Sequence, residues 1–347
     1  TLTSSPPQTS WKFLDRATAT SGNTLSTGTF TAKDNLMILC FTQGNNTVHP
    51  KLNFNADVGQ NYNFRYSGNN SSDASPSVDQ TYFRTQGGIS GSPRQFSVTY
   101  VNNIANQEKL ILNHLISAQT TGANNGPTRE ESVGKWDRVT GSGTGDASSR
   151  ITKVSMNNGQ TGNYAGSTEM IVLGCDNNES DSGSNFWQRL DSSDITTSSN
   201  ATLDSGTITN KKYLWVEING VNDGAVDNCK LRFNGQTSTS DYAYTKGANG
   251  GADGGANTED NGFTYAANNS SHSHYCSIFI VNDTNNEKLM IMEHVEDTAS
   301  GSANAPYRKE LVGKWVTSGV ISSIQSTITS GSGKFGVGSS IRVWGAN

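Results

Sequence analysis

The stretch Pro127-Thr-Arg-Glu-Glu-Ser-Val-Gly-Lys-Trp136 returns later in the sequence as Pro306-Tyr-Arg-Lys-Glu-Leu-Val-Gly-Lys-Trp315. The two copies are identical at seven of ten positions and lie 179 residues apart. Solenoid repeats have periods of only ~20 to 50 residues, so a repeat of this length predicts a duplicated domain. Each copy is therefore expected to fold around its own hydrophobic core.

Further matches flank this motif in the same order in both halves. The matched pairs are Trp11 with Trp187, Lys51-Leu-Asn-Phe-Asn55 with Lys230-Leu-Arg-Phe-Asn234, Val101-Asn102 with Val281-Asn282, Glu108-Lys-Leu110 with Glu287-Lys-Leu289, and His114 with His294. Within the block from Val101 to His114 the spacing between the copies shifts by one residue. This alignment predicts that His114 and His294 occupy equivalent positions.

The matches also predict the domain organisation. Residues 10–175 and 186–347 are the two domains. The residues between them, 176–185, are almost all polar and predict a flexible linker. Residues 1–9 contain the pair Pro6-Pro7, which favours an extended backbone, so they are expected to form an N-terminal arm.

The hydrophobic pattern within each copy is that of β-strands. Leu36–Phe41 and Tyr213–Ile218 are predicted central strands, and Phe96–Val101 is expected to form a hairpin with the strand that contains Leu110–Leu112. About eight to ten short strands per copy, separated by Gly, Asn and Ser clusters, are typical of a two-sheet sandwich. The predicted fold is all-β, with two tandem homologous β-sandwich domains of jelly-roll type.

Composition and charge exclude several classes of function. The chain of 347 residues is 32% hydrophobic and 16% charged, with 37 glycines and a net charge of −5. Its basic residues are scattered, whereas nucleic-acid binding needs them clustered, so no nucleic-acid partner is predicted. The sequence has no apolar stretch of ~18 residues and no basic head followed by an apolar core. Neither membrane insertion nor a secretion signal is predicted.

The four cysteines do not form a framework shared by the two copies. Cys40, Cys175, Cys229 and Cys276 fall at positions that do not correspond, and none belongs to a CxxC pair. We interpret them as buried free thiols.

Four histidines are the candidate site residues, although a structural role is favoured for each. His114 and His294 each lie near the end of a predicted strand, where a histidine can act as a base or ligand or can simply make a hydrogen bond. His272 and His274 lie two apart and would share one strand face, which makes half of a metal site. The first copy has no counterpart of this pair.

The aligned pairs Arg129 with Glu131 and Arg308 with Glu310 lie two residues apart, on one strand face. A glycosidase needs two carboxylates, one of them protonated, whereas a neighbouring arginine favours the ionised form. We interpret these as intra-strand ion pairs that set a sheet edge or an inter-domain contact. No catalytic residue and no cofactor is predicted.

Calcium remains an open alternative because loop carboxylates are the ligands it prefers. The candidate ligands are Asp176 to Asp181, Asp253 and Glu259-Asp260. They do not follow the twelve-residue pattern of a calcium-binding loop. The glycine-rich residues 247–255 lack the Lys-Ser/Thr that a phosphate-binding loop requires, and are predicted to form a mobile loop.

The repeat motif resembles that of β-rich proteins encoded by tailed phages and archaeal viruses, marine ones in particular. The resemblance covers nearly the whole chain. Its shared positions are Pro127, Arg129, Glu131, Gly134, Lys135 and Trp136 in the first copy, and Pro306, Arg308, Glu310, Gly313, Lys314 and Trp315 in the second. It implies a structural component of a virion, made in the host cytoplasm, and it brings no catalytic residues.

Three functions therefore stand as hypotheses. The first is a non-enzymatic virion protein, in the capsid, its decoration, a spike or a fibre, that works by symmetric self-assembly with other virion proteins. The second is an adhesion module that binds a host-surface glycan, which exposed Trp, Tyr and Asn side chains would favour. The third is a carbohydrate-active enzyme. Because charge and proline are scarce in the predicted strands, we expect a homo-oligomer that covers its open sheet edges.

Overall fold

The computed structural model describes residues 10–19, 21–44, 48–69, 71–76, 79–85, 94–118, 122–137, 150–178, 185–249, 251, 253–266, 273–297 and 306–347. Within these ranges every regular element is a strand, as predicted, and no helix could cross a membrane. The predicted N-terminal arm and residues 179–184 of the predicted linker lie outside them.

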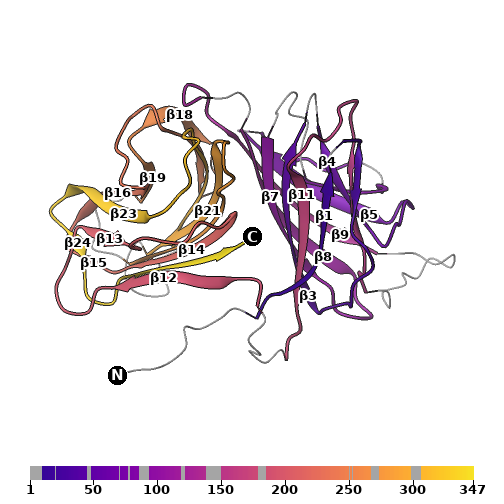
Figure 1. Cartoon of the computed structure of the whole chain (residues 1–347), viewed down its shortest axis with the longest axis horizontal. Coiled ribbons are helices and arrows are strands. Elements are labelled where there is room, and N and C mark those ends of the chain that lie inside the picture. Colours follow the sequence, from indigo (N-terminus) through magenta and orange to yellow (C-terminus); the bar gives the residue numbers. More distant parts are fainter. Residues whose placement is uncertain are drawn as a thin grey trace. The chain divides into compact units, whose positions relative to one another are not determined.

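The chain divides into two compact units, each with strands in two layers (Figure 1). The first sandwich comprises the described residues within 8–120 and 128–186. The second sandwich comprises those within 187–347 together with residues 122–127.

The first sandwich has a seven-stranded and a four-stranded antiparallel sheet. The larger sheet runs in the order β1 (Lys12–Ala19), β11 (Thr168–Cys175), β3 (Asn35–Gln43), β7 (Arg94–Asn102), β8 (Lys109–Ser117), β9 (Thr128–Trp136), β5 (Tyr62–Gly68). The smaller sheet runs in the order β2 (Thr24–Ser26), β10 (Val154–Asn158), β4 (Pro50–Phe54), β6 (Phe83–Arg84).

The second sandwich repeats this strand order and adds one strand to the larger sheet. That sheet runs β12 (Gln188–Asp194), β25 (Ser340–Ala346), β14 (Tyr213–Gly220), β20 (His274–Val281), β21 (Lys288–Glu296), β22 (Tyr307–Trp315), β17 (Tyr242–Ala248), β18 (Gly254–Asp260). The smaller sheet runs β13 (Thr202–Asp204), β23 (Ile324–Gly331), β16 (Val226–Phe233), β19 (Phe263–Ala266), and β15 (Asn222–Asp223) pairs with β24 (Lys334–Phe335). The predicted duplication of one β-sandwich is confirmed.

The pairing of early strands with late ones makes each sandwich jelly-roll-like. In the first, β1 pairs with β11 and β2 pairs with β10. Strands from the two ends of the repeat are therefore neighbours in both sheets. The β7–β8–β9 meander, which contains the predicted hairpin, extends the larger sheet. The predicted central strands are β3 and β14, and both are interior.

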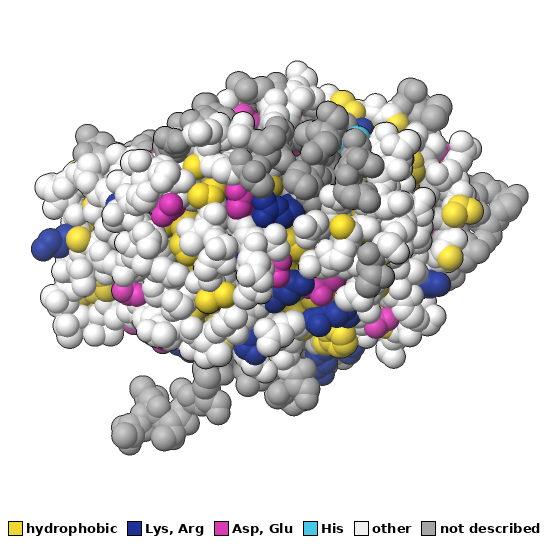
Figure 2. Space-filling model, turned by 45° about the horizontal axis from the view of Figure 1, so that its top comes forward, with side chains coloured by type: hydrophobic (Ala, Val, Ile, Leu, Met, Phe, Trp, Pro, Cys, Tyr) yellow, Lys and Arg dark blue, Asp and Glu magenta, His cyan; other side chains and the backbone are white. Residues whose placement is uncertain are grey.

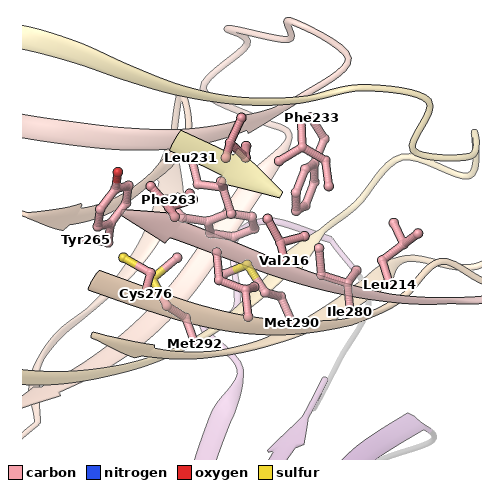
Figure 3. Packing of buried hydrophobic residues seen from close by; sticks show 14 of the residues in the cluster. Leu214, Val216, Leu231, Phe233, Phe263, Tyr265, Cys276, Ile280, Met290 and Met292 are labelled. Atoms are coloured by element: carbon pink, nitrogen blue, oxygen red, sulfur yellow. The ribbon is translucent and has the colours of Figure 1, made fainter. Parts of the chain in front are cut away.

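Alternating side chains of the two sheets form the core of each sandwich. In the second, Leu214, Val216 and Ile280 of the larger sheet face Leu231 and Phe233 of the smaller one (Figure 3). The first sandwich has a corresponding buried cluster. Outside the cores charge is sparse, and the surface in Figure 2 consists mostly of uncharged polar side chains and backbone.

Two buried asparagines explain why Asn recurs in the aligned blocks. Asn103 Nδ2 donates to the carbonyls of Lys33 and Ile151, and Asn103 Oδ1 accepts from Ile151 N at 2.7 Å. Asn282 makes the same set of bonds, with Lys211 and Ile321. These side chains satisfy backbone groups that no strand pairs, which is required of buried polar groups.

The asparagine bonds correct the alignment of the repeats. Asn282 corresponds to Asn103, not to Asn102, because only Asn103 makes the equivalent bonds. The turns that follow agree, since Asn106 and Asn285 both have left-handed φ angles, of 61° and 70°. The equivalent residues are thus 179 positions apart here, as Trp136 and Trp315 are. The predicted one-residue shift in spacing is wrong.

The prediction of a mobile loop over residues 247–255 is also wrong, because both ends of this segment lie in strands. Gly247 and Ala248 belong to β17, and Gly254 and Gly255 belong to β18. The two strands pair with each other through an irregular register.

Candidate functional site

The repeat motif occupies interior strands of the larger sheets. Pro127 and Pro306 stand directly before β9 and β22. Arg129 pairs with Glu131 on β9, and Arg308 pairs with Glu310 on β22. The predicted intra-strand ion pairs are confirmed, whereas a role at a sheet edge is wrong, because each strand has a neighbour on both sides.

The Gly-Lys-Trp end of the motif is architectural in both sandwiches. Gly134 lies against the ring of Phe83, and an added Cβ would come within 2.6 Å of it. Gly313 lies in the same way against Phe263. Glycine therefore lets an aromatic ring of the smaller sheet pack directly on the backbone of the larger one.

The tryptophans that follow are 1% exposed in both copies and belong to the two hydrophobic cores. The Trp136 Nε1 donates to Asp57 Oδ2 at 2.7 Å. The Trp315 Nε1 is buried without a hydrogen-bond partner. The motif lysines differ between the copies. Lys135 is exposed and forms an ion pair with Glu108 at 2.8 Å, whereas Lys314 is buried and lies between Leu289 and Ala243 in the register.

His114 and His294 are not equivalent, contrary to the alignment. His114 stands opposite Glu131, and the residue opposite Glu310 in the second sandwich is Glu293. His114 is half-buried on the outer face of its sheet, whereas His294 points into the core and is 3% exposed. A shift of one residue moves a side chain to the other face of a strand, so the two histidines have different environments.

The predicted pairing of His272 with His274 cannot be followed, because His272 lies outside the described residues. His274 instead approaches His294, with ring centroids 5.8 Å apart, and both rings contact Tyr265. The sequence analysis missed this group. Its signal was that His274 begins β20 and His294 lies two residues before the end of β21, which puts them at the same end of one hairpin.

Two of the loop carboxylates proposed for calcium, Asp176 and Asp260, make ion pairs, whereas residues 179–181 and the side chain of Glu259 lie outside the part of the chain that the structure describes. Asp176 Oδ2 accepts from Lys33 Nζ at 2.7 Å, and Asp260 is bound by Lys230. Burial raises the pKa of Asp260, but the hydrogen bonds from Lys230 and neighbouring groups outweigh it and leave the pKa lowered. Among the residues that the structure describes, no three His, Cys, Asp or Glu side chains are grouped to hold a metal ion.

The predicted burial is confirmed for Cys40, Cys229 and Cys276 but is wrong for Cys175, which is partly exposed at the end of β11, and none of the four forms a disulfide. Burial raises the pKa of the Cys40 thiol to about 12, against a smaller effect of a hydrogen bond with Ser97. Burial likewise raises that of Cys229 to about 12. Thiols with such pKa values are poor nucleophiles, which agrees with the predicted packing role.

The first sandwich has an open hollow of about 1030 Å³ on the outer face of its larger sheet. Two cross-strand rows form its floor. One row contains Tyr100, Leu112, Val133 and Arg65, and the next contains Asn102, Leu110, Lys135 and Asn63. Trp11 and Asn35 add to its lining.

The centre of this floor is apolar and open to solvent, with Arg65 and Lys135 toward its rim. Leu110, Leu112 and Val133 are 58%, 52% and 45% exposed. Contiguous exposed aliphatic side chains of this kind mark interaction sites. The sequence signal for this exposed patch was the run Leu110-Ile-Leu112. Three consecutive apolar residues on a strand put hydrophobic side chains on both faces of the sheet.

Comparisons with known proteins give no family. No family model and no curated protein matches the chain. Among solved structures, domains LG4-5 of the mouse laminin alpha1 chain are 9% identical with a TM-score of 0.20, over 99% of this chain and 90% of that one. The outer membrane protein OprG of Pseudomonas aeruginosa is 6% identical with a TM-score of 0.10, over 91% of this chain and 98% of that one.

Proposed function

We propose that the chain is a non-enzymatic structural protein of a virus particle that works by symmetric self-association. The observation that carries the proposal is the exposed apolar floor of the hollow in the first sandwich. Leu112 and Val133 are direct cross-strand partners, and Leu110 follows on the same face, so the three form one patch. The resemblance of the repeat motif to that of virion proteins supports a place for the chain in a virus particle.

The proposed occupant of the patch is a second copy of the chain. In a particle built from many identical subunits, a self-complementary patch is repeated on every neighbour and can close a symmetric assembly. The rim side chains Arg65 and Lys135 would set the register of such a contact more than its strength, as charged groups at an interface rim do.

Light scattering on purified variants tests this proposal. Leu112→Asp places a charge at the centre of the patch, so we expect the oligomer of the unchanged chain to dissociate to monomer. Val58→Asp is the matched control, because Val58 is 76% exposed but lies in the turn before β5, and it should leave the oligomer intact. If Leu112→Asp associates as the unchanged chain does, the patch is not the assembly surface.

A glycan-binding function is the second candidate, and the lining of the same hollow favours it. Trp11 and Tyr100 supply aromatic surface on which a sugar ring can stack, and Asn35, Asn63 and Asn102 supply amide donors and acceptors. The described lining contributes no carboxylate for glycoside hydrolysis, so binding is proposed without turnover.

A glycan array followed by titration of tryptophan fluorescence separates the two candidates. Binding of a sugar that is lost in Tyr100→Ala, in a chain that remains monomeric at high concentration, would replace the assembly function. Absence of binding to any arrayed glycan, together with a stable oligomer, would remove the glycan candidate.

A further inference from the structure

The second sandwich encloses a group of ionisable side chains between its sheets. His274 on β20 and His294 on β21 are 2% and 3% exposed. Gly220, opposite His274 on β14, makes room for the imidazole, since any added Cβ would overlap that ring. The histidines are therefore built into the packing of the core.

The surroundings of the two rings are mostly apolar or aromatic. The ring centroids of Tyr265 lie 5.6 Å from His274 and 5.7 Å from His294, and that of Phe335 lies 6.0 Å from His274. Figure 3 shows Tyr265 and Cys276 at one end of the core cluster. The ionisable groups that face the histidines or interact with them are Cys229 on β16, Lys246 on β17, Tyr265 on β19, Cys276 on β20, Glu296 on β21 and Lys309 on β22.

Among the described residues, the one hydrogen-bond partner of the two rings is the Tyr265 hydroxyl, 3.5 Å from His274 Nε2. His274 Nδ1 and both ring nitrogens of His294 are buried without a hydrogen-bond partner. Lys309 is 3% exposed and already donates its Nζ to the carbonyl of Tyr265. A second and third positive charge would therefore enter a site where the described charged groups are the buried Lys309, the nearby Lys246 and the carboxylate of Glu296.

The pKa values of the histidines follow from this arrangement. Burial lowers the pKa of His274 from 6.5 to about 4. Burial, with repulsion from His274 and Lys309, lowers that of His294 to about 2. Both rings are neutral in the folded sandwich at neutral pH, whereas in an unfolded chain they take up protons near pH 6.5.

The first sandwich provides an internal comparison without these groups. Gln95 stands at the position of His274, opposite Ser117 where the second sandwich has Glu296. Leu115 stands at the position of His294. Gln95 Nε2 donates to the Val48 carbonyl at 2.9 Å, so this polar group is satisfied. Neither side chain gains a charge in acid.

We propose that the buried His274–His294 pair is an acid-sensitive switch that opens the second sandwich while the first stays folded. Below pH 6.5 the histidines of the unfolded chain bind protons, whereas those of the folded core stay neutral. The free energy of unfolding therefore falls as the pH falls. Each histidine multiplies the unfolding constant about tenfold for every pH unit between its unfolded and folded pKa values. The device is independent of the hollow on the first sandwich.

The buried thiols allow each core to be probed separately in the intact chain. Cys229 and Cys276 report on the second core and Cys40 on the first. The probe is 4,4′-dithiodipyridine, which reacts with thiols even in acid, followed by peptide mapping of the labelled cysteines. Between pH 7 and 4.5, labelling of Cys229 and Cys276 is expected to accelerate at least tenfold more than that of Cys40. Equal acceleration of all three, or protection of the pair down to pH 4, would overturn the proposal.

Exchange of the histidines for their counterparts in the first sandwich tests the cause. His274→Gln with His294→Leu is expected to lower the pH midpoint of Cys276 exposure by at least one unit. His114→Gln removes a half-buried histidine of the first sandwich and should leave that midpoint unchanged. An unchanged midpoint in the folded double variant would contradict a role of the histidines. Should that variant expose Cys276 already at pH 7, the comparison of Cys40 with Cys229 and Cys276 in the unchanged chain still decides the proposal.

Discussion

At the scale of single residues, Trp136 and Trp315 occupy equivalent buried positions but differ in the hydrogen bonding of their indole nitrogens. Trp136 donates to Asp57, whereas the buried Nε1 of Trp315 has no hydrogen-bond partner. Replacement by phenylalanine leaves a similar cavity in both sandwiches but breaks a bond to a charged group in the first alone. We expect Trp136→Phe to lower the free energy of unfolding by about 1.5 to 3 kcal/mol more than Trp315→Phe.

Urea unfolding of each variant measures this difference, with protection of Cys40 and of Cys276 reporting on the two cores. Asp57→Asn keeps an oxygen that can accept from Trp136 Nε1 but replaces the oxygen that accepts from Gly59 N, so its loss of stability measures the carboxylate's other bonds separately from the tryptophan. Equal losses in the two tryptophan variants would show that the hydrogen bond to Asp57 adds nothing to stability.

At the scale of elements, the packing of β9 on β6 depends on Gly134. The Cβ of an alanine would meet the ring of Phe83 at 2.6 Å, and that ring is fully buried. We expect Gly134→Ala to cost about 1 to 3 kcal/mol of stability through overpacking. Phe83→Leu in the same chain should recover part of this loss, so that the double variant is more stable than the sum of the single losses predicts. Additive losses would exclude the direct contact as the cause.

The sequence was sufficient to predict the strands and the duplication, because both depend on local patterns. Runs of apolar residues marked β3, β14 and the β7–β8 hairpin, and the aligned motif residues marked the duplication. The alignment of His114 with His294 failed because one residue of error reverses a strand face. The correct alignment of the two repeats follows from the hydrogen bonds of Asn103 and Asn282. These bonds are made with segments distant in the sequence, so the sequence does not reveal them.

At the scale of the whole molecule, the hollow could not be predicted from the sequence. Its floor combines side chains from β5, β7, β8 and β9, which become neighbours only through sheet topology. The run Leu110-Ile-Leu112 indicated a strand with two apolar faces, yet nothing local told which face stays open. The buried histidine pair has the same origin, since it requires the pairing of β20 with β21 and the glycine at position 220.

The difference between the two sandwiches suggests a division of roles within one chain. The first presents an open apolar floor suited to association. The second holds neutral histidines in its core, which makes its stability sensitive to acid. Duplication supplies two copies of one fold, and a few substitutions at equivalent core and surface positions are then enough to separate these properties.

The measurement that tests the central claim most directly is single-particle cryo-electron microscopy of the intact chain at high concentration. The account predicts a closed, symmetric homo-oligomer in which Leu110, Leu112 and Val133 are buried between copies. Isolated monomers at that concentration, or a symmetric assembly whose subunits leave these three side chains open to solvent, would contradict it.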